Sequence, residues 1–347
     1  MKESKFLLLN DIHVSKDNIP EFYDNWGEAI EICKERGIED IIVGGDMFQS
    51  RSSQTLDVLL AVQNALQTAR TNHIFVTLAE GNHDLVDQEA LRGYNSIFND
   101  YPDVEVVDDY FVYSVSDNVD LFVMSYFPEN GSFIERYNEM VSKDMREHNT
   151  NILYIHEGIK GGLATPSDDE LPASIFEPFD SVLVGHYHDR KHIPGTNIQY
   201  IGASRQHNFG EDEEKGYTIL YSDGSTEFVK NKVNTRYRVI DIESLEDIND
   251  DFYAMMQQLR SSGKYKFKLR VHCLSSEASS IDKQKLIDAG ASKVELVTEQ
   301  AKIKLTESQS IEKKFDKQGI KEEYSSFCAE RNIQNVEMGL SYLDKIK

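Results

Sequence analysis

Short apolar runs alternate with longer amphipathic patterns over the first 200 residues of the chain. The longer patterns, at 20–36 and 53–70, repeat apolar side chains every three or four residues, which predicts helices. The short runs are apolar throughout, as is typical of strands buried on both faces of a sheet. We therefore expect a layered α/β domain. The predicted strands are KFLLLN (5–10), DIIVG (40–44), HIFVTLAE (73–80), VDLFVMSYF (119–127), NILYIH (151–156) and DSVLVGH (180–186).

The pattern changes beyond about residue 198. NIQYIGA, KGYTILYSD and STEFVKN are predicted to form an antiparallel run that closes the first domain. A smaller α/β unit is expected from residue 237, and the polar stretch 308–347 has apolar positions at helical spacing. Its predicted elements are strands at 237–244, 264–274 and 292–299 and helices at 246–260 and 280–289. The expected domains are 1–232, 233–300 and 301–347.

Five polar clusters follow predicted strands of the first domain. In α/β sheets the carboxyl ends of the strands lie on one edge, where ligands bind. One such cluster alone is an ordinary turn or helix cap, but five in one chain exceed coincidence. The clusters are NDIH (10–13), GGDMF (44–48), EGNHD (80–84), HEG (156–158) and GHYH (185–188). The residues expected to converge are Asp11, His13, Asp46, Asn82, His83, Asp84, His156, His186 and His188.

The residue types in these clusters point to metal binding. Carboxylates, imidazoles and an amide oxygen together suit manganese, iron or zinc better than magnesium, which prefers oxygen alone. Seven candidate ligands are too many for one tetrahedral site, but they suit two ions that share a carboxylate. Such pairs, about 3.5–4 Å apart, recur in phosphoester hydrolysis. In an extended strand end His186 and His188 share a side, so both are expected to face one cleft.

In this order the clusters resemble the calcineurin-like metallophosphoesterase signature D-x-H, G-D, G-N-H-D/E, H and G-H-x-H over about residues 5–222. GGDMFQSR, GHYHDRK and YIGASRQHNFGEDEEKGYTIL further resemble the SbcD-type nuclease subunit of a double-strand-break repair complex and its short phage counterparts. The resemblance implies a four-layer α/β/β/α sandwich, a small α/β capping domain that binds DNA and a helical C-terminal tail.

The resemblance also implies roles for individual residues. His83 would stabilise charge at the scissile phosphate or protonate the leaving oxygen, and Asp84 would orient His83 and raise its pKa. Arg205 and His207 are either contacts to the DNA backbone or plain loop residues. Asp11, His13 and His188 would hold one metal ion and Asn82, His156 and His186 the other, with Asp46 bridging them.

The leading functional hypothesis is a manganese-dependent DNA exonuclease and endonuclease that uses a metal-activated water. Magnesium, iron and zinc remain possible metals. The implied partners are DNA, an SbcC-type SMC-like ATPase whose coiled coil the helical tail would grip, and a second copy of the chain. The alternatives are a phosphoprotein phosphatase or a cyclic-nucleotide phosphodiesterase of the same fold, and, less favoured, a non-catalytic assembly subunit.

Composition adds limits to this hypothesis. The net charge of −23 argues that metal ions or a basic partner must hold the phosphates of a nucleic acid. Three scattered cysteines predict no disulfide framework and fit a reducing compartment. The apolar run near the N-terminus is too short for a signal peptide, and no stretch reaches the ~18 apolar residues of a membrane span. We expect a cytoplasmic protein without membrane contact.

Overall fold

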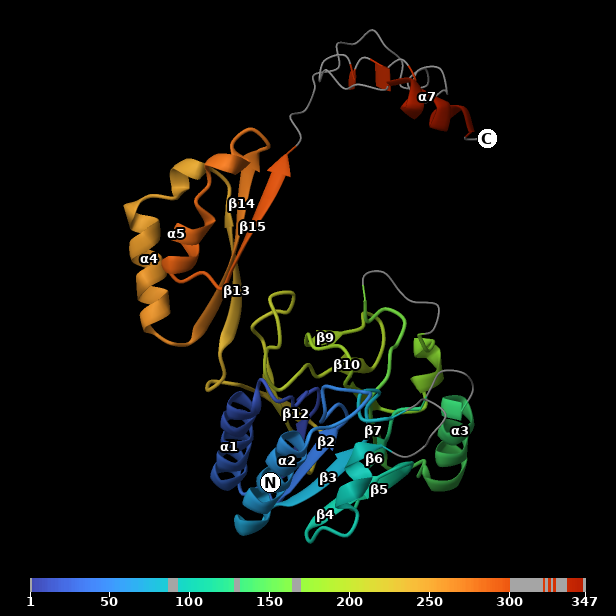
Figure 1. Cartoon of the computed structure of the whole chain (residues 1–347). Coiled ribbons are helices and arrows are strands. Elements are labelled where there is room, and N and C mark those ends of the chain that lie inside the picture. Colours follow the sequence, from blue (N-terminus) through green and yellow to red (C-terminus); the bar gives the residue numbers. More distant parts are fainter. Residues whose placement is uncertain are drawn as a thin grey trace. The chain divides into compact units, whose positions relative to one another are not determined.

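The structure is a computed structural model, shown in Figure 1. The chain divides into two compact units, one of residues 1–271 and 282–295 and one of residues 272–281 and 296–347. The domain boundaries expected from the sequence stay predictions. The structure describes residues 2–86, 93–127, 132–163, 170–299, 321, 324–325, 327–328 and 336–345.

The first sheet holds the N-terminal strands in the order β12-β11-β1-β2-β3-β4. The strands β1 to β4 run parallel to one another, and β11 and β12 extend the sheet in antiparallel fashion. Because parallel neighbours share a direction, the loops after β1, β2 and β3 leave the same edge. The bounds are β1 Ser4–Leu9, β2 Asp40–Gly44, β3 Phe75–Ala79, β4 Val104–Val107, β11 Gly216–Tyr221 and β12 Thr226–Lys230.

The second sheet has the order β5-β6-β7-β8-β10-β9. Its central strands β6, β7, β8 and β10 are parallel, with antiparallel β5 and β9 at the edges. The loops after β7 and β8 therefore also leave from one edge. The bounds are β5 Tyr110–Ser116, β6 Val119–Met124, β7 Thr150–Ile155, β8 Ser181–Val184, β9 Lys191–His192 and β10 Ile198–Tyr200.

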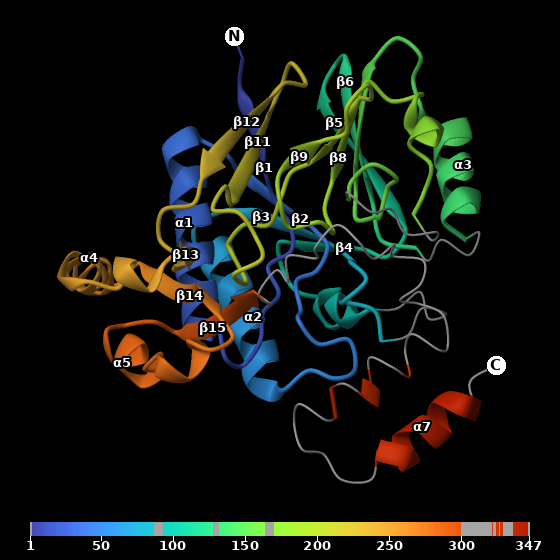
Figure 2. The ribbon, with the colours of Figure 1, turned by 90° about the horizontal axis from the view of Figure 1, so that it is seen from above.

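Three apolar cores lie between four layers of helices and sheets, and Figure 2 shows these layers from above. Side chains alternate across each strand, so Leu7 and Leu9 of β1 pack toward α1 and α2, whereas Leu8 packs between the two sheets. On β7, Tyr154 faces the middle core and Leu153 faces the core under α3. Burying apolar side chains on both faces explains the unbroken apolar runs of the strands. The predicted four-layer α/β/β/α sandwich is confirmed.

The covering helices begin and end at local signals. α1 (Ile19–Arg36) has a proline in its first turn and ends at Gly37, whose φ of 64° is the left-handed conformation that glycine adopts without strain. α2 (Leu56–Thr71) begins after Thr55, whose side chain accepts the N–H of Val58. α3 (Ser132–Asp144) covers the second sheet. The short 3-10 helices are η1 Tyr94–Phe98, η2 Ala173–Phe176, η3 Leu245–Asp247 and η4 Ala278–Ser280.

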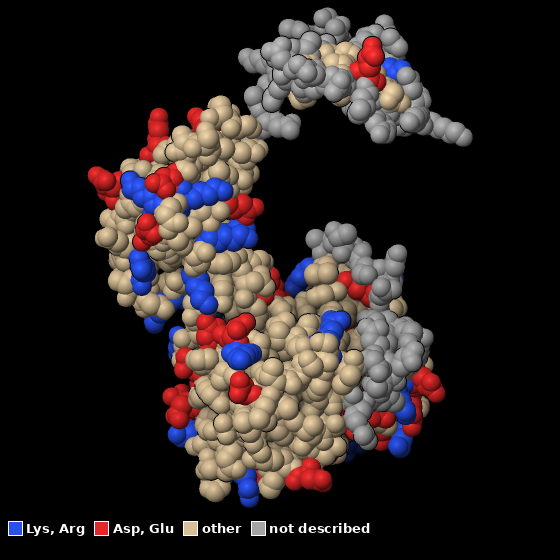
Figure 3. Space-filling model, viewed as in Figure 1, with Lys and Arg blue, Asp and Glu red and all other residues tan. Residues whose placement is uncertain are grey.

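A third sheet has the order β13-β14-β15. β14 buries Phe267, Leu269 and Val271 on one face, and its alternate residues include Lys266 and Lys268. Figure 3 shows lysines and arginines together with aspartates and glutamates on the part of the chain that carries this sheet. The bounds are β13 Arg236–Ile242, α4 Asp250–Ser261, β14 Tyr265–Leu274, α5 Lys283–Asp288, β15 Lys293–Glu299 and α7 Val336–Lys345. Most of the predicted tail lies outside the described residues.

The structure corrects one predicted strand pairing and adds strands that were not predicted. β10 was expected beside β11 in an antiparallel run, but it pairs in parallel with β8 in the other sheet. β4, β5 and β9 were not predicted, because β4 and β9 have only four and two residues and β5 is half-exposed at a sheet edge. No helix in the described part of the chain is long and apolar enough to span a membrane.

Candidate metal centre

The five polar clusters follow β1, β2, β3, β7 and β8, and hydrogen bonds from backbone N–H groups to carbonyl and carboxylate oxygens join the loops that carry them. The N–H groups of Asp11 and His13 donate to the carbonyl oxygens of Gly45 and Asp46 at 3.1 and 3.0 Å. Gly185 donates in turn to Ile155 at 2.9 Å across the second sheet. The loops are therefore fixed to one another before any ligand binds, and the predicted convergence is confirmed for the residues described below.

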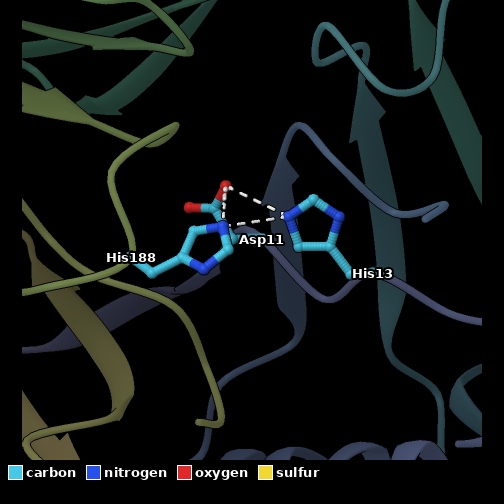
Figure 4. A group of neighbouring side chains, drawn as sticks. All are labelled: Asp11, His13 and His188. Carbon is cyan, nitrogen blue, oxygen red and sulfur yellow. Dashed lines mark hydrogen bonds and ion pairs between the residues drawn. The ribbon is translucent and has the colours of Figure 1, made fainter. Parts of the chain in front are cut away.

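Asp11, His13 and His188 form the first group of candidate ligands (Figure 4). The Nε2 atoms of His13 and His188 lie 3.9 and 3.8 Å from Oδ1 of Asp11, and 3.1 Å from each other. Asp11 is fully buried and His13 is 3% exposed. These separations are too long for good hydrogen bonds to the carboxylate, but they fit ligands placed around one ion with bonds of about 2.0–2.2 Å.

Asp11, Asp46 and His156 form a second group. Nε2 of His156 lies 3.7 Å from Oδ1 of Asp11 and 3.3 Å from Oδ2 of Asp46. The same Asp46 oxygen lies 3.5 Å from Nε2 of His13. Asp46 therefore touches both groups, which is the arrangement expected of a bridging carboxylate.

Several ligand atoms have no hydrogen-bond partner although they are buried. Oδ1 of Asp11 and Nε2 of His156 are both without a partner in the described structure. Leaving a buried carboxylate oxygen unsatisfied costs about 1–3 kcal/mol or more, so such atoms need another explanation. A divalent cation bound to both atoms supplies one, and the carboxylate and imidazole set fits manganese, iron or zinc.

His186 and His188 belong to different parts of the centre. Nδ1 of His186 lies 3.2 Å from Oδ1 of Asn82, and the ring of His186 is 5.5 Å from that of His156. His188 instead approaches Asp11 and His13. The sequence prediction assumed that both histidines lie in an extended strand end. That assumption is wrong, because β8 ends at Val184 and His186 has a left-handed φ of 86°.

The backbone is strained at the ligands themselves. A left-handed φ is uncommon for residues with a side chain and costs of order 1–3 kcal/mol. Such strain persists only where surrounding contacts fix it, here the cross-loop hydrogen bonds. Six non-glycine residues of the described chain have a positive φ, and four of them are Asp11 (51°), His13 (50°), Asp46 (54°) and His186 (86°).

Two glycines allow the loops to close around the ligands. A Cβ on Gly45, whose φ is 107°, would lie 2.4 Å from Nδ1 of His156. A Cβ on Gly81 would lie 2.3 Å from both the backbone nitrogen and Oδ1 of Asp46. Glycine is therefore required by close approach at both positions, in the GGD and EGNHD clusters.

The buried carboxylates of the centre shift the pKa values of the histidines beside them. Burial acts to lower the pKa of His156, but the charges of Asp46 and Asp11 outweigh it and raise that pKa to about 10. Burial lowers the pKa of His13 to about 3. For Asp46, burial is outweighed by His156 and the pKa is lowered. The charges of the two carboxylates thus favour a positive charge beside them, which a bound cation would supply.

His83 lies beside the ligands without a bond to Asp84. Nδ1 of His83 is 2.7 Å from the carbonyl oxygen of Gln49, which can only accept, so Nε2 is the unprotonated nitrogen of the neutral ring. The prediction that Asp84 orients His83 is wrong. Asp84 is fully buried and accepts N–H groups of Gly81, Met47 and Phe48, which ties two ligand loops together. Burial raises the pKa of Asp84 to about 7.

Arg205 and His207 lie behind the first group of ligands. Arg205 is 2% exposed and donates to the carbonyl oxygen of Ile12 at 3.1 Å, so its burial argues against the predicted contact with a DNA backbone. Nε2 of His207 donates to the carbonyl oxygen of Asp11 at 2.7 Å. Glu157, the residue after His156 in the HEG cluster, is fully buried and accepts the N–H of Phe127 at 3.0 Å.

Sequence reasoning missed two residues that hold ligands in place. Asn10, within the NDIH cluster, donates to Oδ2 of Asp11 and accepts from the hydroxyl of Tyr154 at 2.9 Å. Glu211 accepts from Nδ1 of His188 at 2.9 Å. Burial acts to lower the pKa of His188, but this bond and the charge of Asp11 raise it. Glu211 lies 23 residues after His188, so its position in the sequence gives no signal that it binds this ring.

Comparison with known proteins agrees with this geometry. The chain is 25% identical over 248 residues to the putative phosphoesterase 078R of Invertebrate iridescent virus 3, covering 68% of this chain and 67% of that protein. It is 27% identical over 233 residues to the putative phosphoesterase 244L of Invertebrate iridescent virus 6, covering 63% of this chain and 77% of that protein.

A further relative is the DNA double-strand break repair protein Mre11 of Sulfurisphaera tokodaii, 23% identical over 265 residues, covering 69% of this chain and 64% of that protein. Residues 4–190, more than half of the chain, match the family model described as calcineurin-like phosphoesterase. That range contains all five polar clusters. The chain belongs to the calcineurin-like phosphoesterase family.

Proposed function

We propose that the protein is a manganese-dependent nuclease that hydrolyses phosphodiester bonds of DNA. The observation that carries the proposal is the buried pair Asp11 and Asp46, whose oxygens face the Nε2 atoms of His13 and His156 without a hydrogen bond that would satisfy them all. Phosphoester hydrolysis follows from the family, and DNA as the substrate is supported by the similarity to Mre11.

The proposed ligands divide as the family resemblance implies. Asp11, His13 and His188 would hold one ion, and Asn82, His156 and His186 the other, with Asp46 between them. Ions bound there would activate a water and neutralise charge on the phosphate. The fixed loops hold the ligands in place before the substrate arrives, so little reorganisation is needed during the reaction.

His83 is the proposed proton donor. Its ring lies 4.8 Å from that of His13, so it borders the ligands, and it is half-buried. Because Gln49 binds Nδ1, the nitrogen that can exchange a proton with the leaving oxygen is Nε2. His83 also lies within ligand distance of His13 and Asp46, and its exclusion from the metal ligands stays a prediction.

The partners are proposed on the family resemblance. An SbcC-type ATPase would bind the helical tail, of which the structure describes α7 (Val336–Lys345) and a few residues before it. A second copy of the chain would form a dimer. Every contact of the ligand geometry described above lies within one chain.

The test is cleavage by the purified protein. Wild type, His83→Ala and the control His192→Ala, which changes an exposed histidine of β9, are incubated with manganese and linear duplex or single-stranded DNA. We expect the wild type and the control to release nucleotides, and His83→Ala to be slower by about 100-fold or more. Hydrolysis of a phosphomonoester or a cyclic nucleotide without cleavage of any DNA would overturn the nuclease and favour the alternatives.

A further inference from the structure

Glu211 lies between β10 and β11, and its side chain is only 8% exposed. Oε1 accepts from Nδ1 of His188 at 2.9 Å and from the side-chain amide of Asn208 at 2.7 Å. Oε2 accepts the backbone N–H of His207 at 3.0 Å. Both oxygens are therefore held, and the carboxylate has a single position relative to the His188 ring.

A buried lysine supports the same arrangement. Nζ of Lys215 is fully buried, lies 3.9 Å from Oε2 of Glu211 and donates to the backbone carbonyl oxygen of His188 at 2.9 Å. The same Nζ also pairs with the carboxylates of Asp189 and, at 3.1 Å, Asp212. One buried lysine thus holds the backbone of His188 and places a positive charge near the carboxylate that binds its ring.

The hydrogen bond determines which nitrogen of His188 is free. Because Nδ1 of His188 keeps its proton and donates it in the hydrogen bond to Glu211, Nε2 of the neutral ring carries a lone pair. This Nε2 lies 3.8 Å from Oδ1 of Asp11. A carboxylate bound to the far nitrogen of a metal-binding histidine also makes the ring more basic and a better ligand. Loss of such a partner typically costs 10–100-fold in metal affinity.

Glu211 acts on one group of ligands only. Nδ1 of His156 is held by the carbonyl oxygen of Gly44 at 3.0 Å, and Nδ1 of His186 lies 3.2 Å from the amide oxygen of Asn82. Among the candidate histidine ligands, the described structure gives a carboxylate to Nδ1 of His188 alone. The histidine ligands of the two proposed metal sites therefore have different hydrogen-bond partners at Nδ1.

We propose that Glu211 is a positioning residue for the metal site of Asp11, His13 and His188, and that it sets the ion affinity of this site and not of the other. The proposal rests on the proposed function only in requiring that these ligands bind a divalent ion, and it is independent of the substrate. Its test is therefore metal binding, measured without DNA.

Manganese is titrated calorimetrically into the full-length wild type, Glu211→Ala, Glu211→Gln and the control Glu214→Gln. Glu214 lies three residues away, is 57% exposed and pairs with Lys230. We expect Glu211→Ala to weaken one of two sites by about 10–100-fold and to leave the other unchanged. Glu211→Gln keeps the volume and one acceptor oxygen, so it weakens the same site less, and it carries the test should the alanine variant unfold. The control matches the wild type.

Combined variants identify which site is weakened. Added to His188→Ala, Glu211→Ala should cause no further loss, because the ring that it positions is already gone; added to His186→Ala, it should weaken the site that remains. Wild-type affinity at both sites of a folded Glu211 variant, or equal weakening of both sites, would overturn the proposal. Two manganese sites with the expected variant behaviour but no DNA cleavage would leave it standing and overturn only the nuclease.

Discussion

Nε2 of His13 and Nε2 of His188 face each other at 3.1 Å, although the two residues lie 175 positions apart in the sequence. Because Nδ1 of His188 donates to Glu211, its Nε2 is an acceptor in the neutral ring. A lone pair of His188, a nitrogen of His13 and the unpartnered Oδ1 of Asp11 thus meet in one small, buried space. A divalent cation satisfies all three atoms at once, and this underlies the predictions below.

Metal binding should release a proton from His156. The charges of Asp46 and Asp11 raise the pKa of His156 to about 10, so below that pH the metal-free centre carries a proton on this ring that the ion must displace. Manganese affinity should therefore rise with pH, by about tenfold for each unit below 10. Calorimetry in buffers of different ionisation enthalpy measures the released proton, and heats that do not depend on the buffer would contradict the prediction.

Replacing Asp46 should weaken both ions. Oδ2 of Asp46 lies 3.5 Å from Nε2 of His13 and 3.3 Å from Nε2 of His156, so it contacts both groups of ligands. We expect Asp46→Asn to reduce the affinity of both sites and to lower hydrolysis by about 100-fold or more. Asp57→Asn, at a carboxylate that is 62% exposed on α2, is the matched control. Retention of one site at wild-type affinity would show that Asp46 does not bridge.

Replacing Gly81 by alanine should impair metal binding, whereas replacing Gly27 by alanine should stabilise the fold. Gly81→Ala would place a Cβ 2.3 Å from the backbone nitrogen and Oδ1 of Asp46, so it should displace that carboxylate and impair metal binding. Gly27→Ala, within α1, meets no atom within 4 Å and should raise the free energy of unfolding by about 0.5–1 kcal/mol. Thermal unfolding and manganese titration of both variants measure the difference. Unchanged metal binding in Gly81→Ala would refute the close approach.

Arg205 should support the fold and not contact DNA phosphates. Its guanidinium is buried and donates to the carbonyl oxygen of Ile12, so Arg205→Met should lower the free energy of unfolding by about 1–3 kcal/mol. The salt dependence of DNA binding should stay as in the wild type, whereas loss of a phosphate contact lowers its slope by about 1. Arg36→Met, at an arginine 43% exposed on α1, is the control for surface charge. A reduced slope for Arg205→Met alone would restore the predicted DNA contact.

Local patterns determined much of the architecture. α1 and β2 were predicted almost residue for residue, because the helical period and Gly37 mark the helix and an unbroken apolar run marks a doubly buried strand. β10 was assigned to the wrong sheet, because a strand of only three residues has no sequence pattern that indicates its pairing partner. Periodicity depends on neighbouring residues in the sequence, whereas the pairing of strands depends on segments that lie far apart in it.

The sequence by itself determined which side chains form the centre, because each cluster directly follows a strand and strand ends meet at one edge. Only the tertiary structure decided how they act. In the folded protein Nδ1 of His188 donates a hydrogen bond to Glu211, and Nδ1 of His83 donates one to the carbonyl oxygen of Gln49. Asp84 accepts hydrogen bonds from backbone N–H groups, and Arg205 is buried. The physical reason is that a hydrogen-bond partner is chosen by distance and direction in space, and contacts between distant segments exist only after the layers have packed.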